Sequence, residues 1–310
     1  MILIDLQQLI FAAVMNTHFH PAPTLEPGVS EDVDKVGFIR HLILNSIRNL
    51  VKTFTKEYGT PVVVMEGKEC WRKHVFPHYK AKRKDQRNAL PDHVKELLQA
   101  SHDIKKELKT SLPYAVVQID GAEADDVIAV LAKEAQEPVL ICSSDKDFLQ
   151  LHQVHPFVIR QYSPIKRMLI EPEHTAKQSL MEKICTGDAG DGIPNICSPS
   201  DTFVKKDARQ KSFRKARIQE FLITGIDSCR DRDERDRFKL NQKLIDFTFI
   251  PDPLQTQIRS EYQKCAPSTY NEFYHYLITN RLSHLASVVD EFGAKRLNRP
   301  TTTALEKLLT

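Results

Sequence analysis

The stretch from Glu123 to Asp147 constrains the fold of this chain more than any other. It begins with Glu123, Asp125 and Asp126, continues through a helical run and an apolar strand, and ends with Asp145 and Asp147. A short, wholly apolar strand is typical of a buried parallel sheet. Because the carboxyl ends of parallel strands meet at one edge of a sheet, we expect both acidic groups at that edge.

Carboxylates gathered in this way repel one another and need a cation to stay ionised near neutral pH. The two acidic groups offer only oxygen ligands, which favours a hard ion such as Mg²⁺ or Mn²⁺. The alternative is a solvated loop with aspartates that cap helices, since Asp is common just before a helix. Two acidic groups joined by a buried strand favour metal binding.

Two earlier apolar strands also end in a carboxylate. Residues 1–4 lead into Asp5, and residues 61–65 lead into Glu66. A third strand, 114–120, leads into the acidic group that begins at Glu123. Amphipathic helices are expected between these strands, so the pattern predicts an α/β fold with a parallel sheet and helices on both faces. The expected helices are 36–58 and 91–112, and a strand hairpin is expected over 157–170.

Composition limits the functional classes. With 310 residues the chain can form two domains and a sizeable core. Its apolar runs are too short to span a membrane, and its start lacks a basic flank before an apolar core. The six cysteines include no CxxC pair, so we expect neither a zinc site nor a disulfide framework, and a reducing cytoplasmic location.

Basic residues are concentrated in two blocks. The first block follows Glu66 and interleaves Lys and Arg with aromatic residues, a combination suited to phosphates and bases. The second block lies in the C-terminal half. A solvated helix face is the alternative for either block. The predicted nucleic-acid contacts are Arg72, Lys73, Lys82, Lys84, Arg87, Lys205, Lys206, Arg209, Lys211, Arg214, Lys215 and Arg217.

The composition changes after residue 178. Residues 175–185 are expected to be helical, and a glycine-rich turn then presents Asp188 and Asp191, although Gly and Asp are also ordinary turn formers. The mixed-charge stretch 230–239 is interpreted as a solvated helix or loop. We therefore predict a nuclease-like α/β domain at 1–178, a mostly helical DNA-binding domain at 179–292 and a tail at 293–310.

The acids at strand ends and turns outnumber the ligands that one ion needs. Two divalent ions roughly 4 Å apart can bind both sides of a scissile phosphate, and nearby cations stabilise its charge. The sequence has no GxxxxGK[ST] phosphate loop and no evident Ser-His-Asp or Cys-His arrangement. The chemistry therefore favours two-metal hydrolysis of a nucleic-acid backbone. The candidate ligands are Asp5, Glu66, Glu123, Asp125, Asp126, Asp145, Asp147, Asp188 and Asp191.

At these residues the chain resembles the 5′-nuclease family, which includes flap endonucleases, and within it the ribonucleases H of T-even phages. The resemblance covers residues 1–292. It implies a PIN/resolvase-like sheet and a helical second domain. The motifs that carry it are Ile4-Asp5, Trp71-Arg72 with Tyr79-Lys80 and Arg83, Glu123-Ala124-Asp125-Asp126, Ser143-Ser144-Asp145-Lys146-Asp147, and Thr186-Gly187-Asp188 with Asp191.

The resemblance implies roles for these residues. Two Mg²⁺ ions, replaceable by Mn²⁺, would be bound by two sets of acids, and Glu123 and Asp126 would act in direct or outer positions. Tyr79, Lys80 and Arg83 would lie over the scissile phosphate on a helix that bridges the site. The first ion's ligands would be Asp5, Glu66, Asp125 and Asp145, and the second ion's would be Asp147, Asp188 and Asp191, partly through water.

The implied activity removes short products from the 5′ ends of RNA–DNA and DNA–DNA duplexes and cleaves flaps. In a phage-infected bacterial cell it would clear RNA primers during DNA replication. The implied partners of the monomer are a single-stranded DNA-binding protein and a sliding clamp. The runner-up is a non-catalytic nucleic-acid-binding protein on the same fold, which would have little reason to keep so many repelling acids. A phosphatase for small substrates is disfavoured by the two basic blocks.

Two departures from the family pattern stand out. Glu66 occupies a position where the family has Asp, and its longer side chain could shift one ion. Residues 195–203 lack the glycine pattern of the hairpin that grips duplex backbone, often with K⁺, in the family. We therefore expect the basic block at 205–217 to take over this contact, and the sequence leaves a K⁺ requirement open.

Overall fold

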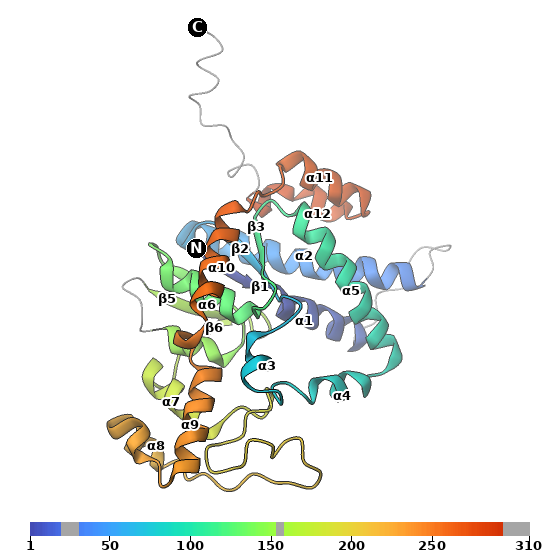
Figure 1. Ribbon diagram of the computed structural model, residues 1–310. Coiled ribbons are helices and arrows are strands. Elements are labelled where there is room, and N and C mark those ends of the chain that lie inside the picture. Colours follow the sequence, from blue (N-terminus) through green and yellow to red (C-terminus); the bar gives the residue numbers. More distant parts are fainter. Residues whose placement is uncertain (20–30, 153–157, 294–310) are drawn as a thin grey trace.

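The computed structural model of the protein describes residues 1–19, 31–152 and 158–293. Its centre is a six-stranded sheet with the order β3-β2-β1-β4-β5-β6 (Figure 1). The first five strands in this order run parallel, and β6 pairs antiparallel with β5, which confirms the predicted hairpin. The strands are β1 Ile2–Asp5, β2 Pro61–Met65, β3 Ala115–Gln118, β4 Val139–Cys142, β5 Ile159–Ser163 and β6 Met168–Leu169.

The central strands are buried on both faces. Every residue of β1, β2 and β4 is buried, as expected for continuous apolar runs in a parallel sheet. Successive side chains alternate between the faces, so Ile2 and Ile4 enter one core cluster and Leu3 enters the other. The sheet therefore forms the middle of three layers.

Helices cover both faces, as the sequence predicts. On one face lie α1, α2 and α5, joined by the C-terminal α11 and α12, and the other face is covered by α6 and α10 (Figure 1). The two helices nearest the C-terminus therefore return to the α/β core. The bounds are α1 Leu6–Phe19, α2 Glu31–Tyr58, α5 Asp92–Ser111, α6 Ala124–Glu134, α10 Asp252–Lys264, α11 Tyr270–Thr279 and α12 Ser283–Ser287.

A third cluster lies beyond the carboxyl edge of the sheet and involves α7, Ala176–Thr186, α8, Arg217–Thr224, and α9, Arg232–Ile245. The prediction of a solvated element at 230–239 is wrong for its inner face. There Phe238 stacks on Phe221 at 5.4 Å, and Glu234 is buried against Arg217. Charged residues can occupy a buried helix face when each finds a partner.

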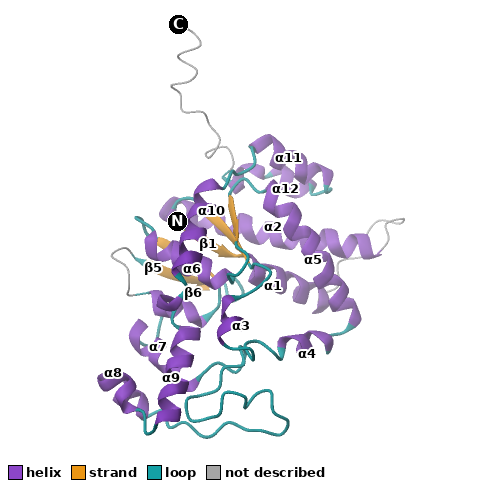
Figure 2. Cartoon of the chain, in the orientation of Figure 1, coloured by secondary structure: helices purple, strands orange, loops and turns teal. Residues whose placement is uncertain are grey.

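Short elements complete the chain. Helices α3, Trp71–Val75, and α4, Arg83–Asn88, flank a turn, and the segment 187–216, which the structure describes throughout, contains no helix or strand (Figure 2). Among the described helices, none is long and apolar enough to cross a membrane. The predicted tail lies outside the described residues apart from Gly293. The 3-10 helices are η1 Lys146–Leu151, η2 Gly225–Ser228, η3 Phe247–Phe249 and η4 Val289–Phe292.

Candidate active site

Three aspartates converge at the carboxyl edge of the sheet. Strands β1 and β4 are neighbours, and β1 ends at Asp5 while β4 leads into Asp145. Asp125 lies in the first turn of α6, just after β3. From β1 the chain adds β2 and then β3 on one side, and it later adds β4 and β5 on the other side of β1. This reversal of strand order is where open α/β sheets place their sites.

Buried polar residues fix the positions of two of these aspartates. Ser143 Oγ donates to Asp5 Oδ2 at 3.2 Å and accepts from the Asp145 backbone N–H at 3.2 Å. Gln161 Nε2 donates to the carbonyls of Ser143 and Asp145 at 2.8 and 2.6 Å. The sequence analysis missed Gln161, which lies among other polar residues of strand β5 and so gives no distinct signal.

The three aspartates are buried with too little opposing positive charge to keep their pKa values in the usual range. Burial, with the nearby Asp145 carboxylate adding, raises the pKa of Asp5 to about 6. Burial and Asp145 raise the pKa of Asp125 well above its usual range, and burial raises that of Asp145 against the opposing effect of Lys183. Within the part of the chain that the structure describes, none of the three forms an ion pair. Mutual repulsion in a buried site favours a bound cation.

Asp126 lies elsewhere, although it directly follows Asp125. It is fully buried, and its Oδ2 accepts from Trp71 Nε1 at 3.1 Å and from Arg72 Nη1 at 2.9 Å. It also accepts the Glu123 backbone N–H at 3.0 Å and so completes a capping box with Glu123. Asp126 therefore serves as a structural residue of the α6 N-terminus, and its predicted place among the ligands is not supported.

Arg72 belongs to the same buried network, so its prediction as a nucleic-acid contact is wrong. Its side chain is 4% exposed, and its guanidinium pairs with Asp126 and Glu123 and donates to the Leu244 carbonyl at 2.7 Å. Burial opposes ionisation of Glu123, but Lys80 and Arg72 lower its pKa to about 2. The periodicity of a basic segment does not show whether an arginine side chain is buried or exposed.

Tyr79 and Lys80 lie in the turn between α3 and α4, so the predicted bridging helix is absent at these described residues. Lys80 adopts a φ of 56°, and its backbone N–H donates to the Asp191 carbonyl at 2.8 Å. Its ammonium pairs with Glu123 and lies 3.6 Å from Asp191. The Tyr79 hydroxyl oxygen lies 2.8 Å from Glu123 Oε2 and 2.9 Å from Asp191 Oδ2, and its single hydrogen is directed to this pair of carboxylates. Both residues thus reach the acidic edge from a turn.

Arg83 and Asp191 complete this side of the site. Arg83 begins α4, and its Nη2 donates to Asp191 Oδ1 at 2.9 Å. Burial would lower the pKa of Lys80, but the Asp191 and Glu123 carboxylates outweigh it and keep Lys80 charged. Tyr79, Lys80 and Arg83 are therefore together, as predicted, and each contacts a carboxylate of the site.

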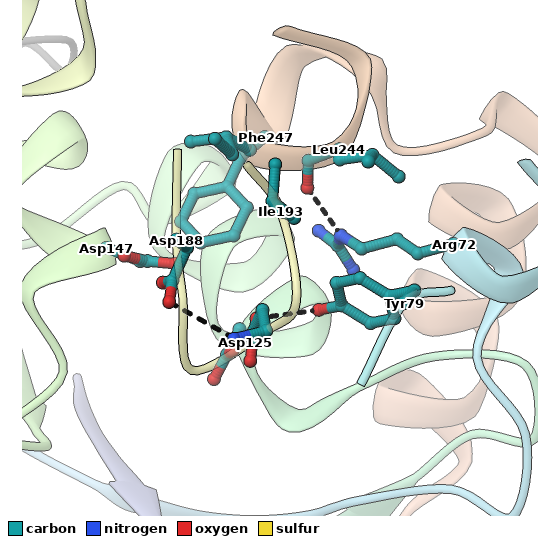
Figure 3. A pocket seen from close by; sticks show the side chains of 10 residues that line it. Arg72, Tyr79, Asp125, Asp147, Asp188, Ile193, Leu244 and Phe247 are labelled. Atoms are coloured by element: carbon teal, nitrogen blue, oxygen red, sulfur yellow. Dashed lines mark hydrogen bonds between the residues drawn. The ribbon is translucent and has the colours of Figure 1, made fainter. Parts of the chain in front are cut away.

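A second acidic group adjoins the first. Figure 3 shows Asp147 and Asp188 at a pocket that Asp125 and Tyr79 also line. Asp188 follows Gly187, whose φ is 70° and whose Cβ, if present, would lie 2.3 Å from the Ile193 carbonyl oxygen. Only glycine fits such a turn. The backbone conformation therefore requires Gly187 before Asp188, whether or not Asp188 binds a ligand.

Lys183 was not among the predicted residues. It lies in the last turn of α7, and its ammonium pairs with Asp147 and with Asp188, the latter at 2.8 Å. A lysine in the last turn of a helix is common for electrostatic reasons. The available signal was its position one helical turn before the Thr-Gly-Asp motif.

Glu66 follows β2 at the same edge and is partly buried. Burial lowers the pKa of Lys105, and the nearby carboxylates of Glu66 and Asp5 partly oppose this shift. Glu66 is therefore close to Asp5, as the strand pairing requires. Lys105 donates to Gln7 Oε1 and is a further cation at this edge that the sequence analysis missed.

Most of the predicted nucleic-acid contacts are exposed. Lys82 also lies over the Phe203 ring at 5.6 Å, which joins the first basic block to the segment that holds the second. Arg217 is an exception and a correction, because it is buried and pairs with Glu234 at 2.6 Å. The Lys84 side chain lies outside the described residues. The exposed set is Lys73, Lys82, Arg87, Lys205, Lys206, Arg209, Lys211, Arg214 and Lys215.

The donor set fits hard divalent cations. All of the converging ligands are carboxylates, and Asp5, Asp125 and Asp145 hold the uncompensated charge that such an ion would neutralise. Among the described side chains, no three His, Cys, Asp or Glu already surround one point as ligands. Ion binding would therefore require small side-chain adjustments.

The chain belongs to the 5′-3′ exonuclease family. Residues 1–184 match the model of the 5′-3′ exonuclease N-terminal resolvase-like domain, and residues 174–292 match the model of the T4 RNase H C-terminal region. Together the two matches cover the sheet, the acidic edge and the helices beyond it. The family is one of nucleases, which act on phosphodiester bonds.

Individual relatives agree with this assignment. The chain is 32% identical over 274 residues to the ribonuclease H of Enterobacteria phage T4, and the match covers 84% of this chain and 89% of that protein. The flap endonuclease Xni of Shewanella sp. (strain W3-18-1) is 34% identical over 144 residues, which cover 43% of this chain and 51% of Xni.

Solved structures share the fold. The D15 protein of phage T5, co-crystallised with metal ions, aligns with a TM-score of 0.56 at 16% identity, over 85% of this chain and 98% of that one. A complex of the T5 D15 flap endonuclease with DNA and metal ions aligns with a TM-score of 0.55 at 16% identity, over 85% of this chain and 97% of that one. Both alignments concern the fold alone.

Proposed function

We propose that this protein is a Mg²⁺-dependent 5′-nuclease that hydrolyses phosphodiesters at the 5′ ends of RNA–DNA and DNA–DNA duplexes and cleaves flaps. The observation that carries the proposal is the convergence of Asp5, Asp125 and Asp145 at one sheet edge, where burial raises the pKa of each and none forms an ion pair among the described residues. A binding protein would gain nothing from this repulsion, whereas a metal-dependent nuclease needs it.

Two ions are proposed, with Mn²⁺ as a possible replacement for Mg²⁺. Asp5, Glu66, Asp125 and Asp145 would hold the first ion, and Asp147, Asp188 and Asp191 would hold the second. Glu123 is better assigned to the network that holds Lys80 and Arg72 in place. When bound, such ions lower the pKa of a coordinated water and stabilise the charge on a phosphate under attack.

The chain's own cations would handle the substrate's charge. Lys80 and Arg83 stand at the rim of the acidic edge, so they can neutralise a phosphate that lies between them and the carboxylates. Tyr79 holds Asp191 and Glu123 through its hydroxyl and thereby orients the turn that carries Lys80. These residues would bind and orient the reacting phosphate, and the buried surroundings would exclude bulk water.

The duplex would be gripped by the exposed bases of the segment 205–215 and by Lys73, Lys82 and Arg87. The Lys82–Phe203 contact joins the two blocks and supports one continuous surface. In this proposal residues 1–178 supply most of the nuclease site and Asp188 and Asp191 complete it. The DNA contacts of the 179–292 region come from its part before α10. The role would be RNA-primer removal in phage DNA replication, in the cytoplasm of the infected cell, by a monomer that cooperates with a single-stranded DNA-binding protein and a sliding clamp.

The proposal is tested with 5′-labelled substrates: a nicked duplex, a 5′ flap and an RNA-primed duplex. Each is incubated with the protein in Mg²⁺ or in EDTA, and the products are mapped on sequencing gels. We expect short products from the 5′ end in Mg²⁺ only, and none from the Asp145→Asn variant. Duplex binding without cleavage under every condition would instead identify a binding protein on this fold.

A further inference from the structure

Lys183 holds two acids of the second group from two different parts of the chain. Asp147 follows β4 in η1, whereas Asp188 lies in the turn after α7. Lys183 reaches both from the last turn of α7, with its ammonium 2.8 Å from Asp188 Oδ2 and in contact with Asp147 Oδ1. One covalently attached cation therefore sits between two carboxylates that would otherwise repel each other.

The two carboxylates are aligned for this shared contact. Asp188 Oδ1 accepts the backbone N–H groups of Gly190 and Asp191 at 2.8 and 3.1 Å, which directs Oδ2 toward Lys183. The Asp147 backbone N–H is fixed by Asp145 Oδ1 at 2.9 Å. The Asp188 carboxylate and the Asp147 backbone are thus held in place, while the lysine reaches both side chains on a flexible four-carbon stem.

Lys183 is also accessible, unlike the arginine of the buried network. Its side chain is 22% exposed, compared with 4% for Arg72. A partly exposed ammonium on a flexible stem can leave its position without unfolding its surroundings. The buried Arg72 cannot, because its withdrawal would leave Glu123 and Asp126 uncompensated.

We propose that Lys183 is a tethered counter-ion that neutralises Asp147 and Asp188 until a divalent cation displaces it. The inference rests on the proposed function, because it assigns these two acids to the second ion. An ammonium and a divalent cation cannot both occupy the space between the same oxygens. The free protein therefore binds its second ion weakly, and the released ammonium becomes available to a phosphate of the substrate.

The test is a calorimetric titration of the metal-free full chain with Mn²⁺, in the absence of nucleic acid. Wild type is compared with Lys183→Met and Lys183→Gln, which remove the ammonium, and with Lys183→Arg, which keeps a cation. Lys177→Met is the matched control, because Lys177 lies on the same helix and donates only to the Leu222 carbonyl among its described contacts. We expect the two neutral variants to bind the second Mn²⁺ about tenfold more tightly, within the range of ordinary coupling energies.

Lys183→Arg and Lys177→Met should bind Mn²⁺ as the wild type does, and Asp147→Asn should remove the tightened step from Lys183→Met. Circular dichroism and the affinity for the first ion report whether each variant is folded. Unchanged or weaker binding of the second ion in both neutral variants would overturn the inference, since Lys183 would then support the site. If wild type binds no Mn²⁺ at all, the proposed function itself fails, which is a different result.

Discussion

Two groups of buried acids meet at the carboxyl edge of the sheet, and the chain neutralises one group but not the other. Glu123 and Asp126 are neutralised by Arg72 and Lys80, which belong to the chain itself. Asp5, Asp125 and Asp145 form no ion pair among the described residues, and burial raises the pKa of each. Burial alone therefore does not identify a functional acid, and among these five acids the lack of an ion pair with the chain is what distinguishes the proposed ligands of the first ion.

This contrast distinguishes carboxylates that stabilise the fold from carboxylates that belong to the candidate active site. A buried carboxylate with a fixed cation stabilises the structure that exists, and its loss leaves an uncompensated charge. A buried carboxylate without one costs stability and is retained for what it can bind. The adjacent residues Asp125 and Asp126 belong to different groups, so substitutions at these two positions test the distinction most directly.

The largest expected effect is on cleavage by Asp125→Asn. We expect the rate in Mg²⁺ to fall at least about 100-fold, because a carboxylate proposed to hold the cation is lost, while the melting temperature in EDTA stays the same or rises. Asp126→Asn should keep most of the activity at low temperature. Single-turnover cleavage and thermal unfolding of both variants measure the two effects. Equal losses of activity in both variants would contradict the distinction between Asp125 and Asp126.

The next effect is on stability through Arg72→Met. This change leaves Glu123 and Asp126 buried with one cation fewer, and breaking such a pair costs about 3–5 kcal/mol. Arg83→Met is the control, because Arg83 pairs with Asp191 at the exposed rim, and it should change stability much less. Urea unfolding in EDTA measures both. A small loss for Arg72→Met would mean that the network relaxes and that Arg72 is replaceable.

A pH effect follows from Asp5. Its pKa is raised from 3.8 to about 6 in the folded chain. Protonation therefore favours folding, and this contribution is fully present below about pH 4 and is lost as the pH rises through 6. In EDTA the wild type should become less stable than Asp5→Asn between pH 5 and pH 7.5, by at most about 3 kcal/mol for a shift of this size. Thermal unfolding across this range checks the difference, and Mg²⁺ should reduce it at pH 7.5.

The smallest effect concerns the exposed bases of the segment 205–215. Replacing Lys205, Lys206 and Lys211 by Gln should weaken duplex binding and reduce the slope of log K against log salt by up to about 0.9 for each lost phosphate contact. Lys56→Gln is the control, because Lys56 lies in the last turn of α2, just before β2 begins, and so lies at the opposite edge of the sheet. Fluorescence anisotropy in Ca²⁺ or EDTA at several salt concentrations gives both slopes. An unchanged slope would remove this segment from the binding surface.

Much of the architecture could be predicted from local patterns. Apolar runs bounded by turn residues give the parallel strands, and the 3.6-residue periodicity gives α2 and α5 close to their observed bounds. The acids that follow β1, β2 and β4 could be assigned to one edge, because strand direction fixes which ends meet. The irregular segment at 195–216 also agrees with the absence of a glycine-patterned hairpin.

Other features could not be read from spacing. Arg72 and Arg217 belong to basic blocks in the sequence, yet each turns inward to a buried glutamate. The turn at Lys80 replaces an expected helix, because its backbone N–H bonds to the Asp191 carbonyl more than 100 residues away. The return of α10–α12 to the sheet likewise depends on which apolar faces meet, and periodicity shows only that such faces exist.

The sequence by itself determined the parallel sheet, the set of acids at its carboxyl edge and the two concentrations of basic residues, because these follow from strand direction, hydrophobic pattern and residue type. The tertiary structure alone decided which carboxylates are neutralised by the chain and which are left open. That decision depends on distances of a few ångströms between side chains from separate elements, such as Lys183 with Asp147 and Asp126 with Arg72. Coulomb energy in a buried site varies steeply over such distances, and linear spacing carries no record of them.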